Sequence, residues 1–253
     1  MVAKQRSLKV EGIVLRHRDW GESDRMLTLF TRELGKVQAL AKGVRKVRSR
    51  KAGHVEPFSR VTMLLARGRS FYILTQAEAV NLHSALRDDL ILIGYASYIV
   101  ELLDRFTHDE EQQNLFYRLL ANSLARLNRG HDPKLVTRYY EIHALDFVGY
   151  RPQLVICAHC KVEILPEDQF ISGSQGGVLC PNCGRASREA RPISMQGLKY
   201  IRHFQRSNYQ DASRAQIPEE IYDEIERLMY YYLTYVLERG LNSQTFLRRI
   251  REL

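Results

Sequence analysis

The stretch that decides the fold of the first third of the chain is Arg25-Met-Leu-Thr-Leu-Phe-Thr31, followed after a short gap by Lys36-Val-Gln-Ala-Leu-Ala41. In the first run a single residue separates Leu27 from Leu29, and the second run has small apolar residues at every other position. A period of two is that of a β-strand, in which successive side chains point to opposite faces. The two runs therefore predict two strands with a turn at Gly35.

Three more short runs with strand character occur in this region, at residues 8–15, 60–65 and 70–75. Residues that favour turns fall between or at the ends of the five runs; they are Gly35, Gly43, Gly53, Pro57 and Gly68. Five short strands in about 70 residues fit a small closed barrel, and the OB-fold is a five-stranded barrel of this kind that binds nucleic acid. We therefore expect residues 1–81 to form an OB-fold.

The period of the apolar residues changes to that of a helix after residue 85. Three apolar stripes have helical spacing: Leu92, Tyr95, Ile99 and Leu102; Phe116, Leu120, Leu124 and Leu127; and Leu135, Tyr139, Ile142 and Leu145. Asp132-Pro133 is a helix-start signal and Gly149 a helix-end signal. Helical pattern returns at 194–205 and 218–239, with a short amphipathic tail from Ser243. The sequence therefore predicts an α+β protein whose helical domain, 82–149 and 193–253, is interrupted by a segment at 150–192.

The net charge of +9 is concentrated at one end of the chain. Residues 1–80 carry 17 Lys and Arg against 7 Asp and Glu, whereas the rest carries 21 against 22. A localised cationic surface suits a polyanion, either nucleic acid or an acidic membrane. The most apolar run, Leu90 to Val100, is too short to span a bilayer, and the first residues lack the apolar region of a signal peptide. We therefore expect a soluble, cytoplasmic protein that binds nucleic acid and no membrane.

The densest cationic segment falls between the third and fourth predicted strands. Its basic residues are Lys42, Arg45, Lys46, Arg48, Arg50 and Lys51. From Lys36 to Arg69 there are ten basic residues and one acidic residue, Glu56. Because a merely solvated surface usually mixes both signs, we expect these six side chains to contact DNA phosphates. Trp20, Phe58, Phe71 and Tyr72 are candidates for stacking on bases, although aromatic residues in strands are more often part of the core.

All four cysteines lie in two C-x2-C pairs, Cys157 with Cys160 and Cys180 with Cys183, separated by 19 residues. Two such pairs complete the tetrahedral sulfur set that zinc accepts. Disulfides are disfavoured in a reducing cytoplasm, and catalytic zinc needs an open coordination position. The pattern therefore predicts one structural Zn²⁺ per chain, with Gly184 in a tight turn after the second pair. His159 is an alternative ligand that is more readily interpreted as a surface residue.

Catalytic motifs are missing from the sequence, which has no phosphate-binding loop, no G-x-S-x-G and no H-E-x-x-H. We therefore expect a protein that is not an enzyme. Two alternatives remain: a zinc-ribbon RNA-binding or ribosome-associated factor, which would also be basic and non-catalytic, and a hydrolase whose site the motifs do not reveal.

Seven motifs spread along the chain belong together: Glu11-Gly-Ile-Val-Leu-Arg16, Gly21-Glu-Ser-Asp-Arg25, Leu27-Thr-Leu-Phe-Thr-Arg-Glu-Leu-Gly35, Ala41-Lys-Gly-Val-Arg45, Pro57-Phe, Leu74-Thr-Gln-Ala-Glu78 and Leu145-Asp-Phe-Val-Gly-Tyr-Arg-Pro152. On these motifs the chain resembles the bacterial RecO family of DNA repair proteins over its whole length. The resemblance implies an OB-fold followed by a helical domain with a zinc site. It also implies a recombination mediator of the RecF pathway that binds single- and double-stranded DNA and anneals complementary strands. The implied partners are RecR and the acidic tail of single-stranded-DNA-binding protein, with RecA loaded indirectly at the nucleoid and without ATP hydrolysis by this chain.

Overall fold

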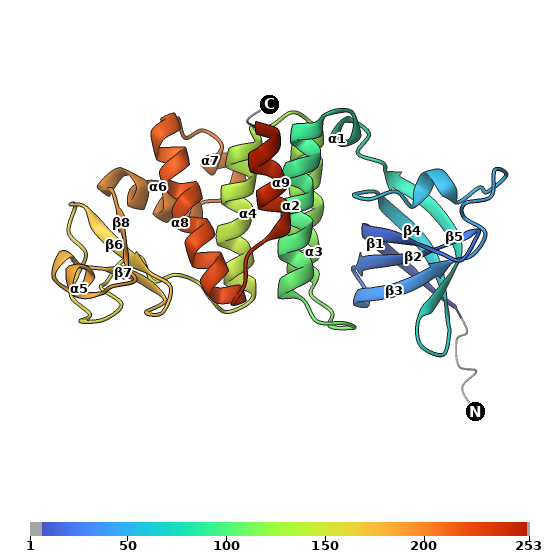
Figure 1. Ribbon diagram of the computed structural model, residues 1–253, viewed down its shortest axis with the longest axis horizontal. Coiled ribbons are helices and arrows are strands. Elements are labelled where there is room, and N and C mark those ends of the chain that lie inside the picture. Colours follow the sequence, from blue (N-terminus) through green and yellow to red (C-terminus); the bar gives the residue numbers. More distant parts are fainter. Residues whose placement is uncertain (1–6, 252–253) are drawn as a thin grey trace. The chain divides into compact units, whose positions relative to one another are not determined.

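The computed structural model describes residues 7–251, which form two compact units (Figure 1). Unit 1 comprises the described residues up to Gly130 and those from Ser243 onward, and unit 2 comprises His131–Asn242. Unit 1 contains a β-barrel and four helices, and unit 2 contains the remaining helices with a small sheet. The domain boundaries expected from the sequence stay a prediction, because this division follows compactness alone.

The barrel of unit 1 has five strands: β1 Ser7–Trp20, β2 Asp24–Thr31, β3 Gly35–Ala41, β4 Arg60–Arg67 and β5 Tyr72–Asn81. It closes in the order β1-β2-β3-β5-β4, with β4 also paired to β1. The pairs are antiparallel except for β3 with β5. The five predicted strands and the closed barrel of an OB-fold are confirmed. β1 and β5 extend well beyond the predicted runs, because their C-terminal halves expose polar side chains that hide the strand pattern.

β1 takes part in both sides of the barrel because it bends. Its N-terminal half pairs with β4 and its C-terminal half with β2, and the register shifts between Val14 and Arg16. Such a bulge bends a strand and increases its twist. Gly12 pairs with both neighbours, and a Cβ atom there would lie 2.8 Å from the Cε atom of Met63. A side chain at Gly12 would therefore have to displace the end of the Met63 side chain.

The barrel interior is apolar, and β2 is buried on both faces. Leu27 and Leu29 lie in the interior cluster, as their alternation predicts. Met26 and Phe30 on the opposite face are also buried, at 3% and 0% exposure. A helix covers that face, since the ring of Phe30 lies 6.3 Å from the ring of Phe116. A helix of unit 1 therefore covers the wall of the barrel at Phe30.

The helices of unit 1 are α1 Ala85–Asp88, α2 Leu90–Phe106, α3 Asn114–Asn128 and α9 Asn242–Arg251. Lys36 Nζ in β3 donates hydrogen bonds to the carbonyl oxygens of Asp104 at 2.8 Å and Thr107 at 2.7 Å. Tyr117 Oη donates to Glu11 Oε1 at 3.0 Å. Polar side chains thus tie the barrel to α2 and α3.

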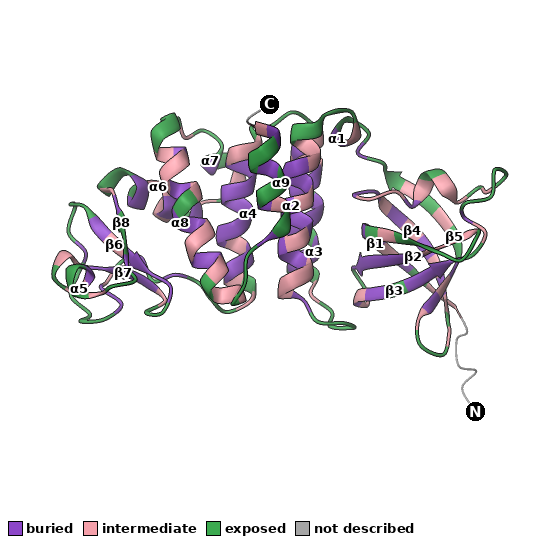
Figure 2. Ribbon diagram, viewed as in Figure 1, coloured by how far each residue is buried: buried purple, intermediate pink, exposed green. Residues whose placement is uncertain are grey.

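Unit 2 contains α4 Pro133–Phe147, β6 Gln169–Ser172, β7 Gly177–Leu179, α5 Pro181–Ala186, β8 Arg191–Ile193, α6 Met195–Arg206, α7 Tyr209–Ala212 and α8 Glu219–Leu237. Helix α4 packs against α6 and α8, and buried residues run along it (Figure 2). Asp132 caps α4 by accepting a hydrogen bond from Lys134 N, and Gly149 follows its C-terminus at a φ of 80°, as predicted. The sheet, in the order β7-β6-β8, was not predicted, because its strands have only three or four residues. Within residues 7–251, no helix combines the length and the apolarity that crossing a membrane requires.

Candidate metal centre and nucleic-acid interface

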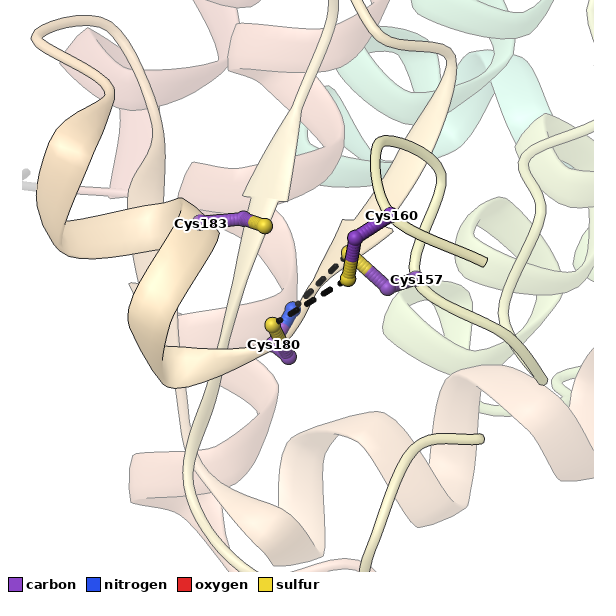
Figure 3. A group of neighbouring side chains, drawn as sticks. All are labelled: Cys157, Cys160, Cys180 and Cys183. Carbon is purple, nitrogen blue, oxygen red and sulfur yellow. Dashed lines mark hydrogen bonds between the residues drawn. The ribbon is translucent and has the colours of Figure 1, made fainter. Parts of the chain in front are cut away.

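The four cysteines of unit 2 converge on one point (Figure 3). Cys157 and Cys160 lie in the turn before β6, and Cys180 and Cys183 lie at the beginning of α5. All four Sγ atoms lie within 4.8 Å of one another, and Cys160 Sγ is 3.8 Å from Cys180 Sγ. His159 is exposed and lies outside this group. The structure therefore brings together the four predicted ligands and leaves the alternative ligand outside.

The first cysteine pair is held by a tight turn. Lys161 N donates to the carbonyl oxygen of Cys157 at 2.9 Å, and Cys157 N donates to that of Val162 at 2.7 Å. Lys161 adopts a φ of 66°, which is uncommon for a residue with a side chain. Its Nζ atom donates back to the carbonyl oxygen of Ala158 at 2.6 Å. These contacts keep both thiols of the pair on one side of the turn.

The second pair is positioned by a helix and not by a turn. Cys180 is the N-cap residue of α5, and Pro181 occupies the first turn, where its missing N–H costs nothing. Gly184 lies inside α5, so the prediction of a tight turn at Gly184 is wrong. A Cβ atom at Gly184 would lie 2.2 Å from the ring of Phe170. The glycine is needed because α5 lies close against β6, a contact that the spacing of the cysteines could not reveal.

The cluster fits a metal ion with four sulfur ligands. A tetrahedron of sulfurs about 2.3 Å from zinc has edges of about 3.8 Å, which matches the Cys160–Cys180 separation. Burial alone raises the pKa of the Cys157 thiol, but N–H groups of Cys160, Cys180 and His159 directed at its sulfur bring the pKa down to about 6. Hydrogen bonding with Cys160 raises the pKa of Cys183 to about 12. Four thiols at such short range are a donor set for a soft cation.

Residues 42–59 form the basic loop, which joins β3 to β4 in unit 1. Two valines anchor it, since Val44 and Val55 are buried in the barrel interior at 1% and 0% exposure. Its backbone is also tied to the β1–β2 turn, because Gly43 N donates to Asp24 Oδ1 at 2.7 Å and Arg45 N donates to the carbonyl oxygen of Ser23 at 2.9 Å. Buried side chains and hydrogen bonds therefore fix the loop to the barrel, although the loop contains no strand.

The six predicted DNA-contacting residues have three different environments. Four are exposed to solvent: Lys42, Lys46, Arg48 and Arg50. Arg45 is also exposed, but its Nη1 atom lies 3.3 Å from Asp19 Oδ2 and donates to the carbonyl oxygen of Gly21 at 3.3 Å. Lys51 is half-buried, and its Nζ atom donates to the carbonyl oxygens of Lys42 at 3.1 Å and Leu74 at 3.2 Å. Burial lowers the pKa of Lys51. Its ammonium group thus holds the loop to β5.

The ion pairs at the base of the basic loop were not predicted from the sequence. Arg25 in β2 lies 2.9 Å from Glu56 and 3.4 Å from Asp19. His17 Nε2 is 3.3 Å from the other carboxylate oxygen of Glu56. A lone acidic residue in a basic run is a signal for such an internal partner, and Glu56 is that residue.

The four candidate stacking residues divide by exposure. Phe58 and Tyr72 are each 7% exposed, so they belong to the core. Trp20, at the end of β1, is 42% exposed, and its ring centroid lies 6.2 Å from that of Phe71. Only the Trp20–Phe71 pair therefore remains a candidate among the four.

Comparison with known proteins agrees with both halves of this architecture. Residues 5–83 match the family model described as "Recombination protein O N terminal", and residues 87–245 match "Recombination protein O C terminal". The chain is 37% identical over 250 residues to the DNA repair protein RecO of Roseiflexus sp. (strain RS-1), covering 99% of this chain and 88% of the relative. It is also 37% identical to that of Pelotomaculum thermopropionicum, with coverages of 95% and 93%, and 33% identical to one from Dehalococcoides mccartyi, with coverages of 94% and 94%. The chain belongs to the RecO family of DNA repair proteins.

Proposed function

We propose that this protein is a recombination mediator that binds single- and double-stranded DNA through the basic loop and anneals complementary strands without hydrolysing nucleotide. The observation that carries the proposal is the set of exposed cations, Lys42, Lys46, Arg48 and Arg50, on a loop that is anchored in an OB-fold. Phosphate contacts made by such side chains are independent of sequence and release counterions. A surface that neutralises phosphates also lowers the repulsion between two strands, which is what annealing requires.

A salt titration tests the use of the loop. If the four exposed cations each neutralise one phosphate, log affinity for a single strand should fall with log salt at a slope of roughly −3, taking about −0.7 per contact. Replacing Lys46, Arg48 and Arg50 with Ala should flatten the slope by about 2. The matched control replaces three exposed arginines outside the loop, Arg118, Arg129 and Arg188, and removes the same charge. Equal slopes for the two triple variants would contradict the proposal.

Annealing separates this function from the RNA-binding alternative. Complementary strands coated with single-stranded-DNA-binding protein should anneal faster with the protein than without it, in buffer free of nucleotide. The loop triple variant should lose most of the acceleration. Preference for a structured RNA over single-stranded DNA in competition, together with no annealing, would favour a zinc-ribbon RNA-binding factor instead.

The proposed protein partners are RecR, the acidic tail of single-stranded-DNA-binding protein and, indirectly, RecA. Unit 2 has a surface suited to the acidic tail, a cavity of about 480 Å³ along α6. Its wall is apolar at Tyr200 and Ala215, and its rim carries Lys199, Arg202, His203 and Arg206. A basic rim around an apolar wall suits a short acidic peptide better than net charge does, because residues 81–253 are near neutral.

The tail-binding surface can be tested on the full chain. Lys199→Glu combined with Arg206→Glu should weaken binding of a tail peptide at least tenfold, measured by fluorescence anisotropy. The loop triple variant should bind the peptide as the wild type does. The reverse pattern would place the tail on the barrel.

The four cysteines complete the proposal, in which Cys157, Cys160, Cys180 and Cys183 hold one structural Zn²⁺ per chain. Four sulfur ligands fill a tetrahedral zinc site, so the ion contributes folding free energy and no catalysis. In this proposal the protein is soluble and acts in the cytoplasm, at the nucleoid.

A further inference from the structure

We infer that Trp20 is a stacking platform for an unpaired base, which lets the barrel hold a single strand by its bases as well as by its phosphates. The inference rests on the proposed DNA binding and adds a second contact that the basic loop does not supply. Trp20 is the last residue of β1, and its side chain stays 42% exposed in a strand that buries most of its large apolar residues.

The indole ring is held in place but remains accessible. Phe71 meets it edge-on, at a centroid separation of 6.2 Å and an interplanar angle of 68°. The guanidinium carbon of Arg18, an exposed residue, lies 5.2 Å from the ring centroid. A planar cation over an exposed ring is weakly held, so a base can take its place while Arg18 moves to a phosphate. Phe71 thus holds the indole ring in place, and Arg18 can be replaced on it by a base.

Polar groups that can reach a nucleotide lie on the same face of the sheet. In the pairing of β1, β2 and β3, Arg18 is opposite Met26, Arg16 is opposite Thr28, and Thr28 is opposite Gln38. Directly paired residues share a face, and these side chains line a cavity of about 220 Å³. Arg18 and Gln38 are exposed at this cavity, whereas Thr28 is 7% exposed and Arg16 also lies 3.4 Å from Asp104 Oδ2. A base on the indole ring therefore has hydrogen-bonding groups alongside it.

The platform adjoins the basic loop. Asp19, the neighbour of Trp20 in the chain, pairs with Arg45 at 3.3 Å, and Arg45 also donates to the carbonyl oxygen of Gly21 at 3.3 Å. The loop therefore meets the end of β1 at which Trp20 lies, and a strand whose phosphates contact the loop can reach the indole ring. Because bases in a duplex are already stacked on one another, only an unpaired base can use the platform, and the contact favours single strands.

Fluorescence gives a direct test, because Trp20 is the only tryptophan in the sequence. Adding oligothymidine to the full-length protein should quench the tryptophan emission. An abasic oligonucleotide of the same length keeps the phosphates but removes the bases, and it should quench far less. Equal quenching by both, or none by either while DNA is bound, would overturn the inference.

Variants give an independent readout. Trp20→Ala should weaken single-strand binding roughly 5- to 100-fold, the range typical of one lost base stack, while Trp20→Phe should retain most of the affinity. Phe246→Ala removes an aromatic ring of similar exposure, 40%, from α9 and should have no effect. The loss should be absent with the abasic strand, and the salt slope should stay unchanged because stacking releases no counterions.

The two proposals fail in different ways. If the loop triple variant flattens the salt slope but Trp20→Ala binds as tightly as wild type, the platform is wrong and DNA binding by the loop stands. If Trp20→Ala weakens duplex and abasic binding equally, the side chain only supports the fold and the inference is overturned. If the wild-type protein binds no DNA, both proposals fall.

Discussion

The basic loop of unit 1 and the cysteine cluster of unit 2 are both segments with little regular structure, but they are held in opposite ways. The loop is anchored by the buried side chains of Val44 and Val55 and by hydrogen bonds to the barrel, so the exposed side chains of Lys42, Lys46, Arg48 and Arg50 are not needed for its fold. The cysteine segment has strands of three or four residues, and four thiols from its two ends converge in it. Charge can therefore be removed from the loop without unfolding it, whereas removing a thiol should unfold its surroundings.

The largest effect is expected for Cys157→Ser. If the proposed zinc site loses this ligand, the zinc content should fall from one per chain towards zero, and residues 150–192 should lose protection in hydrogen exchange, because a structural metal ion supplies folding free energy. Structural zinc sites are worth on the order of 10 kcal/mol in isolated peptides, so the local loss should be complete. DNA affinity and its salt slope should largely survive, since the basic loop belongs to unit 1.

His159→Ser is the matched control, because His159 is exposed within the same turn and lies outside the sulfur cluster. Elemental analysis of the three proteins measures the outcome. A wild-type zinc ratio near zero with free thiols present would contradict the metal site, and loss of zinc in the histidine variant would show that the ligand set is different.

Two glycines test how much the close backbone contact between Gly35 in β3 and the segment before α3 affects the stability of unit 1. Gly35 and Gly21 both have positive φ, 69° and 61°, so alanine is strained at either position. A Cβ atom at Gly35 would lie 1.9 Å from the carbonyl oxygen of Glu111, whereas one at Gly21 meets no atom within 4 Å. Gly21→Ala should cost about 1 kcal/mol of unfolding free energy, and Gly35→Ala about 2 kcal/mol more, because the segment before α3 must move. Urea unfolding measures both, and equal costs would mean that this contact is soft.

The sequence predicts these two regions to different depths. Five strand runs and the turn residues between them suffice to predict the barrel, because the period of a strand, as at Leu27 and Leu29, is a local property of the sequence. The cysteine pairs suffice for the cluster, because spacing encodes the ligand set. Neither the strand pattern nor the cysteine spacing predicts which distant segments contact one another. In the sequence Lys51 is one of six cations of the basic loop, but in the structure its ammonium group donates to two backbone carbonyls. Gly184 was predicted to lie in a turn, but in the structure it leaves room for the ring of Phe170.

Two lysines of the basic loop sharpen this point. Lys51→Ala should destabilise unit 1 by about 1 kcal/mol, because two carbonyl oxygens lose their donor, and it should leave the salt slope of DNA binding unchanged. Lys46→Ala should leave stability unchanged and flatten the slope by about 0.7. Both quantities are measured on both variants, by urea unfolding and by salt titration. If Lys51→Ala flattens the slope as Lys46→Ala does, its ammonium group contacts phosphate and does not only hold the loop.

The smallest effect concerns His83, which follows β5 and is 2% exposed. Burial lowers its pKa below the ordinary 6.5, although a hydrogen bond between its Nδ1 atom and the carbonyl oxygen of Phe58, at 2.9 Å, acts in the opposite direction. At pH values between its two pKa values, His83 therefore binds a proton in the unfolded chain but not in the folded chain. The contribution of His83 to stability is fully present above pH 6.5 and is lost as the pH falls below 6.5 towards the folded pKa.

The slope from this one group can reach at most about 1.4 kcal/mol per pH unit. His83→Asn keeps a donor near the position of Nδ1 and tolerates the φ of 47°, but it does not titrate. The stability difference between wild type and variant should therefore shrink, or change sign in favour of the variant, as the pH drops below 6.5, because other titrating groups are common to both proteins. Urea unfolding at several pH values on either side of 6.5 measures this difference. A difference that stays constant across the range would mean that His83 takes up its proton in the folded barrel as easily as in the unfolded chain.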